Sequence, residues 1–163
     1  MSAGPIFRDI RRKNREVPEH EAREILARAS HGVLATAGAG GWPYAVPVSH
    51  VVAGDSIYVH GAPEGHKLDN LASDERVCYC AVASAEVMPE KLSTRYESAI
   101  VFGRAAVVVD DAERLRALEL LAGRFCGGLT AAAQEVIRSS GPRAAVVRIR
   151  IERITGKANR PPG

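Results

Sequence analysis

The sequence has none of the long apolar runs, and few of the cysteines, that would place it in a membrane or outside the cell. No window reaches the roughly 18–20 consecutive apolar residues that a membrane-spanning helix requires. The charged N-terminal stretch also lacks the apolar segment of a secretory signal. With 46% hydrophobic and 25% charged residues, the chain is typical of a globular protein, and we expect it to be cytoplasmic.

Cysteine is scarce: the 163 residues include three, and no two of them form a Cys-x-x-Cys pair. Cys78 and Cys80 share one face of an expected strand because they are two residues apart. Two ligands without a second pair make a poor zinc site, so we predict no metal. Together with Cys126 they are interpreted as small buried hydrophobic side chains in a reducing compartment.

Several motifs that define common enzyme classes are missing as well. No Gly-x-Gly-x-x-Gly precedes an expected helix, which argues against a dinucleotide-binding Rossmann domain. The Walker A pattern, the Gly-x-Ser-x-Gly nucleophile motif and the His-Glu-x-x-His zinc motif are absent. A net charge of +3 is too small to indicate a nucleic-acid-binding protein by itself.

The length suits one domain with a sizeable core, which we place at residues 18–157. Residues 158–163 form a tail that we expect to be frayed, and residues 1–17 form a basic extension. We favour a solvated extension that packs loosely against the domain over an arm that binds nucleic acid with strong salt dependence. Its basic residues are Arg8, Arg11, Arg12, Lys13 and Arg15.

Hydrophobic periodicity predicts a mainly β chain with flanking helices. Helices are expected at residues 18–30, 65–73, 111–124 and 131–139, and strands at 32–37, 43–52, 56–60, 76–82, 98–110 and 143–156. The first three strands are expected to form an antiparallel meander. Residues 84–97 are expected to be a long connection with a function or a contact between subunits. Six or so antiparallel strands with helices at their margins predict a closed or split β-barrel.

The most informative segment, residues 57–82, reads as strand, tight loop, short helix and strand. The helix carries His66 and Lys67 in its first turn. Because the helix dipole disfavours cations there by roughly 0.3–1 kcal/mol each, the pair indicates a pocket for an anion at the free amide groups. Phosphate is the expected anion, and His60 is a further candidate ligand. The alternative is an ordinary solvated helix start.

The expected strand around Tyr44 to Ser49 is apolar on both faces, like a barrel wall that is covered on both sides. Pro47 cannot donate a hydrogen bond to a neighbouring strand, so it marks an edge or a bulge. Backbone groups beside it are then free to meet either a planar heterocycle or water.

These pieces, in this order, resemble the flavin-binding split barrels related to pyridoxamine 5'-phosphate oxidase. The resembling blocks are GVLATAGAGGWPYAVPVSHV, IYVHGAPEGHKLDNL, STRYESAIVFGRA and RITGK, spread over roughly residues 10–157. They look most like the 5-nitroimidazole resistance branch of that group. The Arg and His signature with which true pyridoxamine phosphate oxidases bind their substrate is not recognisable near the C-terminus, so vitamin B6 oxidation is not expected.

The resemblance implies an FMN-binding split β-barrel that forms a homodimer, with two FMN sites at the subunit interface. It implies a flavin against the strand that contains Pro47, with its phosphate near His60 and the helix start. His66 occupies the position of the branch's active-site histidine. Residues of the STRYES block are expected to reach the flavin from the partner subunit or to brace the interface. The implied cofactor-binding residues are Val46, Pro47, Val48, Ser49, His60, His66, Lys67, Ser93, Thr94, Arg95, Tyr96 and Ser98.

The function that follows from the resemblance is an FMN-dependent oxidoreductase. Electrons would come from a reduced nicotinamide and pass to a small substrate such as a nitroaromatic, with His66 as a proton donor. Three alternatives stay open: a non-catalytic flavin store or sensor, a relative that binds the deazaflavin F420, and a relative that binds haem. The deazaflavin tail would use Arg148, Arg150 and Arg153, and haem would need His50 or His60 as an axial ligand.

Overall fold

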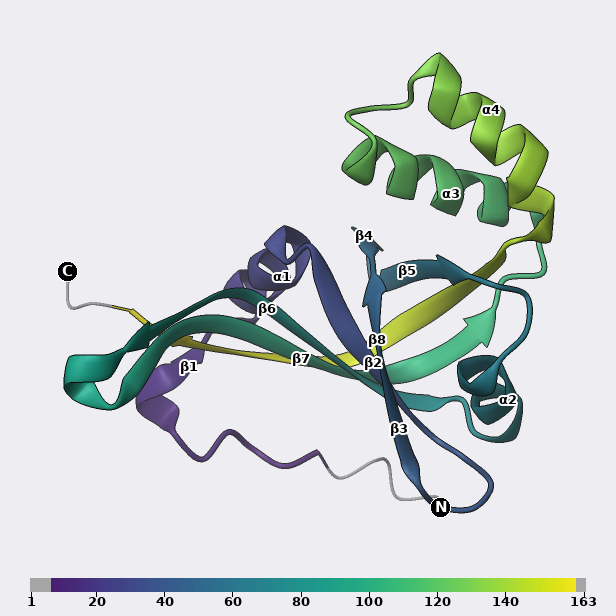
Figure 1. Cartoon of the computed structure of the whole chain (residues 1–163). Coiled ribbons are helices and arrows are strands. Elements are labelled where there is room, and N and C mark those ends of the chain that lie inside the picture. Colours follow the sequence, from purple (N-terminus) through teal and green to yellow (C-terminus); the bar gives the residue numbers. More distant parts are fainter. Residues whose placement is uncertain (1–6, 161–163) are drawn as a thin grey trace.

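The computed structural model describes residues 7–160, which form one curled antiparallel sheet with helices at its margins (Figure 1). The strands are β1 (Glu16–Val17), β2 (His31–Ala37), β3 (Pro43–Ser49), β4 (Val51–Ala53), β5 (Ser56–Gly61), β6 (Arg76–Met88), β7 (Ser93–Val107) and β8 (Ala145–Asn159). They are ordered β3-β2-β6-β7-β8-β5-β4, and β1 pairs with the C-terminal part of β8. This is the mainly β, split-barrel architecture that the sequence predicts.

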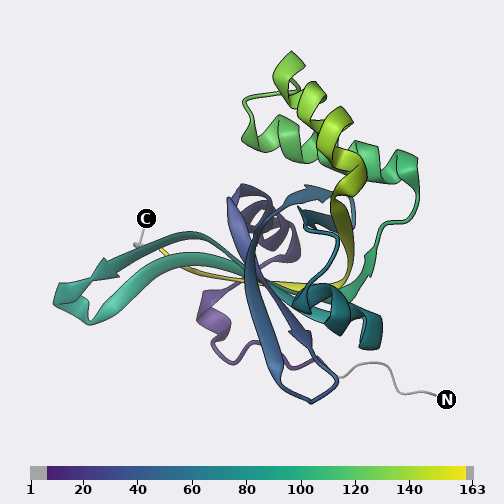
Figure 2. The ribbon, with the colours of Figure 1, turned by 45° about the vertical axis from the view of Figure 1, so that its right-hand side comes forward.

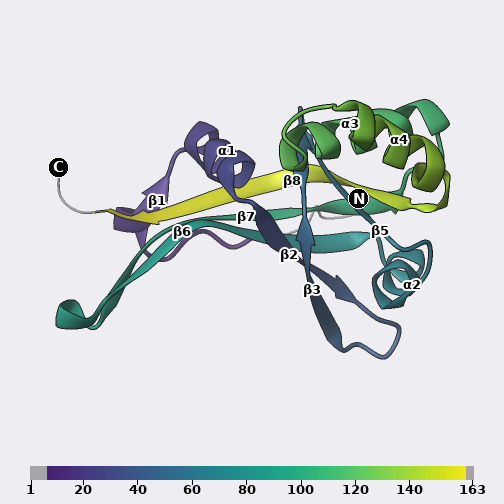
Figure 3. The same ribbon diagram turned by 45° about the horizontal axis from the view of Figure 1, so that its top comes forward.

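Helices and turns complete the described chain: α1 (Glu19–Arg28), α2 (His66–Ser73), α3 (Asp111–Phe125), α4 (Ala131–Ser140), η1 (Lys13–Arg15), η2 (Pro89–Lys91) and η3 (Gly141–Arg143). The four α-helices match the predicted ones closely. Asp110 and Thr130 begin α3 and α4 by accepting backbone hydrogen bonds with their side chains. The α3–α4 pair lies over one end of the sheet (Figure 3). Within residues 7–160, no helix is both long and apolar enough to cross a membrane.

A single residue, His50, joins the two opposite edges of the sheet. β3 pairs with β2 at one edge, and β4 pairs with β5 at the other. Because only His50 separates β3 from β4, the sheet curls until its edges meet, which makes it a half-barrel (Figure 1). The predictions of one continuous strand over residues 43–52 and of a simple meander are therefore wrong, since the chain changes its pairing partner at this corner.

Hydrogen bonds hold the His50 side chain in a fully buried position. Nε2 donates to the carbonyl of Leu26 at 2.8 Å, so Nδ1 is left to accept from the hydroxyl of Tyr79 at 2.9 Å. The Tyr79 ring packs against Gly32, where an added Cβ would stand 2.5 Å from it. Burial lowers the pKa of His50, because an uncompensated charge is unfavourable there.

The hydrophobic core lies between α1 and the inner face of the curled sheet. Ala22, Ile25 and Leu26 of α1 are fully buried and follow the helical spacing of the sequence. The end of α1 is also tied to α3, because Arg124 donates to the carbonyls of Ala27 and Ala29. Core side chains from the sheet include Leu34, Ile57, Val59, Tyr79, Val101 and Ile149.

β6 and β7 continue beyond the body of the sheet as a projecting hairpin (Figures 1 and 2). Their ladder extends to the pair Met88 and Ser93, and Leu92 closes the turn with a φ of 45°. The prediction of a long connection over residues 84–97 is therefore wrong. The hairpin extends away from the core, so neither of its faces has to be apolar. The alternation of apolar and polar residues that would predict a strand is therefore weak there.

The described part of the basic extension packs along the outer side of the sheet. The Phe7 ring lies 5.1 Å from the Phe102 ring, centroid to centroid, and the Asp9 carboxylate lies 3.0 Å from the guanidinium of Arg153. At the other terminus, β8 includes two residues of the predicted tail and ends at Asn159. Residues 1–6 and 161–163 of the predicted extension and tail lie outside the described residues.

The buried corner predicts a pH-dependent stability. An unfolded histidine titrates near pH 6.5, whereas the pKa of His50 is lowered in the fold. The unfolded chain therefore takes up the proton first, and the contribution of His50 is complete above about pH 6.5 and lost as the pH falls below it. We expect His50→Gln to cost about 1–3 kcal/mol at pH 7.5, and the difference from the wild type to shrink at pH 5.

Urea unfolding at both pH values measures this effect. The exposed His20 on α1 supplies the control, since His20→Gln should follow the wild type at both pH values. A gap between wild type and His50→Gln that stays constant from pH 7.5 to pH 5 would contradict the assignment.

Candidate cofactor site

Side chains of β3, β5 and α2, all within residues 43–73, come together around the edge strand β3. The Tyr44 ring of β3 packs on the His66 ring of α2, with centroids 4.1 Å apart and planes tilted by 33°. Ser49 at the end of β3 and His60 at the end of β5 line the same cavity. Several residues of β3, β5 and α2 that the sequence assigns to a flavin site are thus neighbours within one protomer.

The first turn of α2 is open to an anion. Gly65 precedes it with a φ of 124°, a conformation that favours glycine. Among the described residues, no side chain caps this end of the helix. The Gly65 carbonyl accepts from the amides of Leu68 and Asp69 at 2.8 and 3.2 Å. The amides that precede those two remain available to a ligand.

Lys67 lies over the end of β5. A Cβ built on Gly61 would stand 3.0 Å from Lys67 Nζ, so glycine at this position lets the ammonium group approach the strand. His60 is the preceding residue. Its pKa is lowered, first by the surrounding protein and then by the positive charge of Lys67. His60 is exposed, but it lines a cavity whose other walls are α3 and α4, and these surroundings account for desolvation as the main cause.

β3 is an edge strand, as the proline at position 47 indicates. Within the described chain its ladder is formed with β2 alone, so its other side offers free backbone groups. Val46 and Val48 turn inward and pack against the core, while Pro47 and Ser49 are exposed. The expectation of a strand covered on both faces is therefore wrong for the protomer, because Ala45 and Pro47 on the outer face are exposed.

The residues of the STRYES block do not join this site in one protomer. Ser93, Thr94 and Arg95 belong to the part of β7 that projects as the hairpin, and Tyr96 and Ser98 pair with Asn159 and Lys157 at the C-terminal end of β8. The hairpin lies on the far side of the molecule from α2 (Figure 1). Arg95 pairs there with Glu86 at 3.4 Å.

The alternatives proposed from the sequence find less support. Both ring nitrogens of His50 are already hydrogen-bonded, so His50 cannot ligate haem without breaking the corner. Three arginines on the outer face of β8 would have to hold a deazaflavin tail, and each is in an ion pair. Arg148 pairs with Glu113, Arg150 with Glu152, and Arg153 with Asp9.

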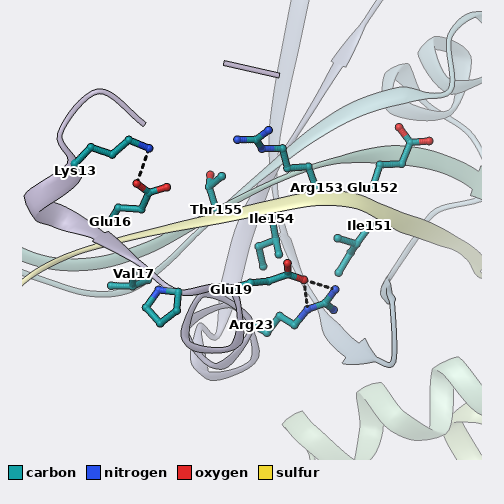
Figure 4. A pocket seen from close by; sticks show the side chains of 11 residues that line it. Lys13, Glu16, Val17, Glu19, Arg23, Ile151, Glu152, Arg153, Ile154 and Thr155 are labelled. Carbon is teal, nitrogen blue, oxygen red and sulfur yellow. Dashed lines mark hydrogen bonds and ion pairs between the residues drawn. The ribbon is translucent and has the colours of Figure 1, made fainter. Parts of the chain in front are cut away.

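A separate cavity of about 610 Å³ lies between η1, α1 and β8 (Figure 4). It is rich in charged side chains, but they neutralise one another. Lys13 pairs with Glu16 at 2.8 Å, and Arg23 pairs with Glu19 at 3.0 Å. Glu152 and Arg153, which also line it, pair with Arg104 and Asp9. No charge is left free to recognise a cofactor phosphate, so this cavity is the weaker candidate.

Two parts of the site were missed by reasoning from the sequence. Tyr44 was placed on the right strand, but nothing in a spacing of 22 residues signals its contact with His66. The two C-terminal helices were recognised as helices, yet they also wall a cavity that reaches His60. Both features arise from the curl of the sheet, and local sequence patterns do not record it.

The curled antiparallel sheet, with α1 packed on its inner face, defines a split β-barrel protein. The chain belongs to the pyridoxamine 5'-phosphate oxidase family, whose model matches residues 18–158. The resemblance drawn from the sequence is thereby confirmed at the level of the family. A comparison with curated proteins finds no significant match.

Solved structures share the fold at low sequence identity. A conserved hypothetical protein from Mycobacterium tuberculosis is 18% identical, with a TM-score of 0.79 over 95% of this chain and 98% of that one. A FAD and heme binding protein from Mycobacterium smegmatis is 24% identical, with a TM-score of 0.76 over 90% and 74%. A candidate 5-nitroimidazole antibiotic resistance protein from Bacteroides thetaiotaomicron is 21% identical, with a TM-score of 0.73 over 87% and 85%.

The geometry of the site predicts how His60 titrates in the flavin-free protein. We expect its pKa to lie below 6.5, and to rise when Lys67→Met removes the neighbouring positive charge. NMR of the histidine ring protons as a function of pH measures both values. Lys13→Met, in η1 near the opposite end of β8 from His60, is the matched control and should leave His60 unchanged. If Lys67→Met also leaves the titration midpoint of His60 unchanged, the two side chains are not neighbours.

Proposed function

We propose that this protein binds FMN and acts as an oxidoreductase, passing electrons from a reduced nicotinamide to a small substrate such as a nitroaromatic. The observation that carries the proposal is the open first turn of α2, with Lys67 and His60 beside it and an edge strand alongside. A lysine at a helix start is electrostatically unfavourable unless an anion joins it. The FMN phosphate would be that anion.

The residues of the site fit the remaining parts of the cofactor. Free backbone groups on the outer side of β3 would hydrogen-bond the rim of the flavin ring near Pro47 and Ser49. The Tyr44 ring packs against His66 and limits how that side chain can turn. When bound, FMN would supply the redox chemistry, while the protein binds it, orients it and excludes water.

His66 is the proposed proton donor to the reduced substrate. It is exposed at the start of α2, so a substrate above the site could reach it. Histidine is the side chain that most readily donates a proton near neutral pH. No nucleophile is needed for such a reaction.

We place the protein in a reducing cytoplasm, the compartment in which its three unpaired cysteines would stay reduced.

A homodimer is part of the proposal, because the outer face of the sheet presents apolar side chains to water. The register places Pro47, Val33, Cys80 and Ile100 in one row across β3, β2, β6 and β7. The projecting hairpin exposes Val87 by 71% and Leu92 by 98%. Apolar surface of this kind, next to a hairpin that leaves its own core, suits a subunit interface.

The dimer would also account for the separated STRYES block. A hairpin that contacts no other part of its own cofactor site is free to reach across a two-fold axis. Ser93 and Arg95 would then approach the flavin bound to the partner subunit.

The fold match to a FAD and heme binding protein leaves FAD as the second candidate for the same pocket.

We expect FMN to remain bound through purification or to rebind on addition, and Lys67→Met to weaken it about 10-fold to 100-fold. The loss corresponds to one charge-assisted hydrogen bond, roughly 1.5–3 kcal/mol. Titration followed by flavin fluorescence measures the affinity.

Riboflavin, which lacks the phosphate, is the matched ligand and should bind wild type and variant equally. Lys13→Met is the matched protein control. Equal FMN affinity in wild type and Lys67→Met would mean that the phosphate binds elsewhere. Tighter binding of FAD than of FMN would mean that FAD, and not FMN, is the cofactor.

For the dimer, we expect Val33→Glu to give a monomer in sedimentation measurements, because it puts a charge into the apolar row. The wild type should sediment as a dimer. Val109→Glu changes a residue that is 92% exposed outside this row and should remain dimeric. A dimer that survives Val33→Glu would assign the interface to another face.

A further inference from the structure

A second cavity, of about 590 Å³, lies between the α3–α4 pair and the strand ends beneath it. Leu121 and Phe125 of α3 and Val136 and Ile137 of α4 contribute to its walls. Small-molecule sites are typically concave, mostly apolar and about 300–1,000 Å³ in volume. The cavity meets that description, and neither the predicted nor the proposed flavin site gives the two helices any role.

Charge is absent from the lining. Of the residues that the structure describes around this cavity, none is Lys, Arg, Asp or Glu. The other cavities differ: the one in Figure 4 is lined by six charged side chains, and one beside the hairpin is lined by Arg15, Lys91, Arg95 and Arg160. An unpaired ion is strongly disfavoured within an uncharged apolar lining. The occupant is therefore an uncharged molecule.

His60 and Ser49 give the cavity one polar end. The lowered pKa of His60 keeps its ring neutral at physiological pH, and a neutral imidazole offers one donor and one acceptor. The Thr130 hydroxyl, which also lines the cavity, already accepts from the amide of Ala133 at 3.2 Å. The hydrogen-bonding group of the occupant therefore belongs at the His60 end.

We propose that this cavity binds an uncharged, mainly apolar molecule, with its hydrogen-bonding group at His60 and Ser49. Binding there does not require flavin. His60 and Ser49 are shared with the proposed flavin site, so the cavity is also where the substrate would meet the flavin. That second role rests on the proposed function.

The neutral fluorophore N-phenyl-1-naphthylamine tests the binding step on the flavin-free full chain. We expect saturable binding, with a shift of the His60 ring signal in NMR and none of His20. Ala132→Phe, at an exposed position that lines the cavity, should weaken binding at least tenfold. Ala131→Phe, on the neighbouring exposed residue outside the lining, should bind the probe like the wild type.

A second pair of variants guards against misfolding of the first. Val136→Lys places a charge in the lining and should also weaken binding tenfold, whereas Gln134→Lys on the same helix should not. Equal probe affinity in all variants, or no binding to the wild type, overturns the proposal. So does a wild-type dimer that Ala132→Phe or Val136→Lys dissociates, since a second copy would then fill the cavity.

FMN binding by the same variants is measured separately from probe binding. Ala132→Phe should bind FMN as tightly as the wild type, because Ala132 lies in the helical wall and not at the start of α2. If the probe binds as expected while FMN does not bind to any variant, the cavity stands and the proposed function fails. If FMN binds and the probe does not, the proposed function stands and the proposal for the cavity fails.

Discussion

The buried corner at His50 is the constraint on which the rest of the structure depends. It joins the strands at the two edges of the sheet, and no other residue separates them. A fully buried imidazole is tolerated when both nitrogens are hydrogen-bonded, and here the partners come from α1 and β6. The corner therefore ties the curl of the sheet to the helix that covers its inner face. Arg124 extends the connection to α3 through the last carbonyls of α1.

The same corner explains why the candidate site lies where it does. The half-barrel is closed by a turn of the chain and not by a ladder, so β3 keeps one side of its backbone free. The curl carries that free edge to the end of β5 and the start of α2. The stretch from Gly61 to Lys67 then sets an ammonium group against a glycine and leaves a helix start uncapped. A cation at an uncapped helix start is electrostatically unfavourable, and an anion bound there would offset that cost.

The charged and the uncharged cavities lie in different parts of the molecule. Around η1 and β8 every charged side chain that lines the cavity has an opposite partner, so that region serves mainly to fasten the N-terminal segment to the sheet. Under α3 and α4 the lining holds no charge among the described residues, and His60 and Ser49 form one polar end of it. His60 thus stands between a region suited to an anion and one suited to a neutral molecule. The hairpin is a third feature, with apolar residues exposed far from the core of its own chain.

The sequence by itself determined the helices, most of the strands, the family and the cationic helix start. All of these depend on residues close together in the chain, such as the apolar stripe of Ala22, Ile25 and Leu26 or the pair His66 and Lys67. The break at His50 and the length of the hairpin were not predictable in this way. A buried histidine and an exposed strand both depart from the periodic patterns that reveal strands. Tertiary structure alone decided that Tyr44 meets His66, that the STRYES block stands apart from them, and that His60 opens into a cavity. These contacts depend on how far the sheet curls, which is set by long-range hydrogen bonds and packing across the whole barrel.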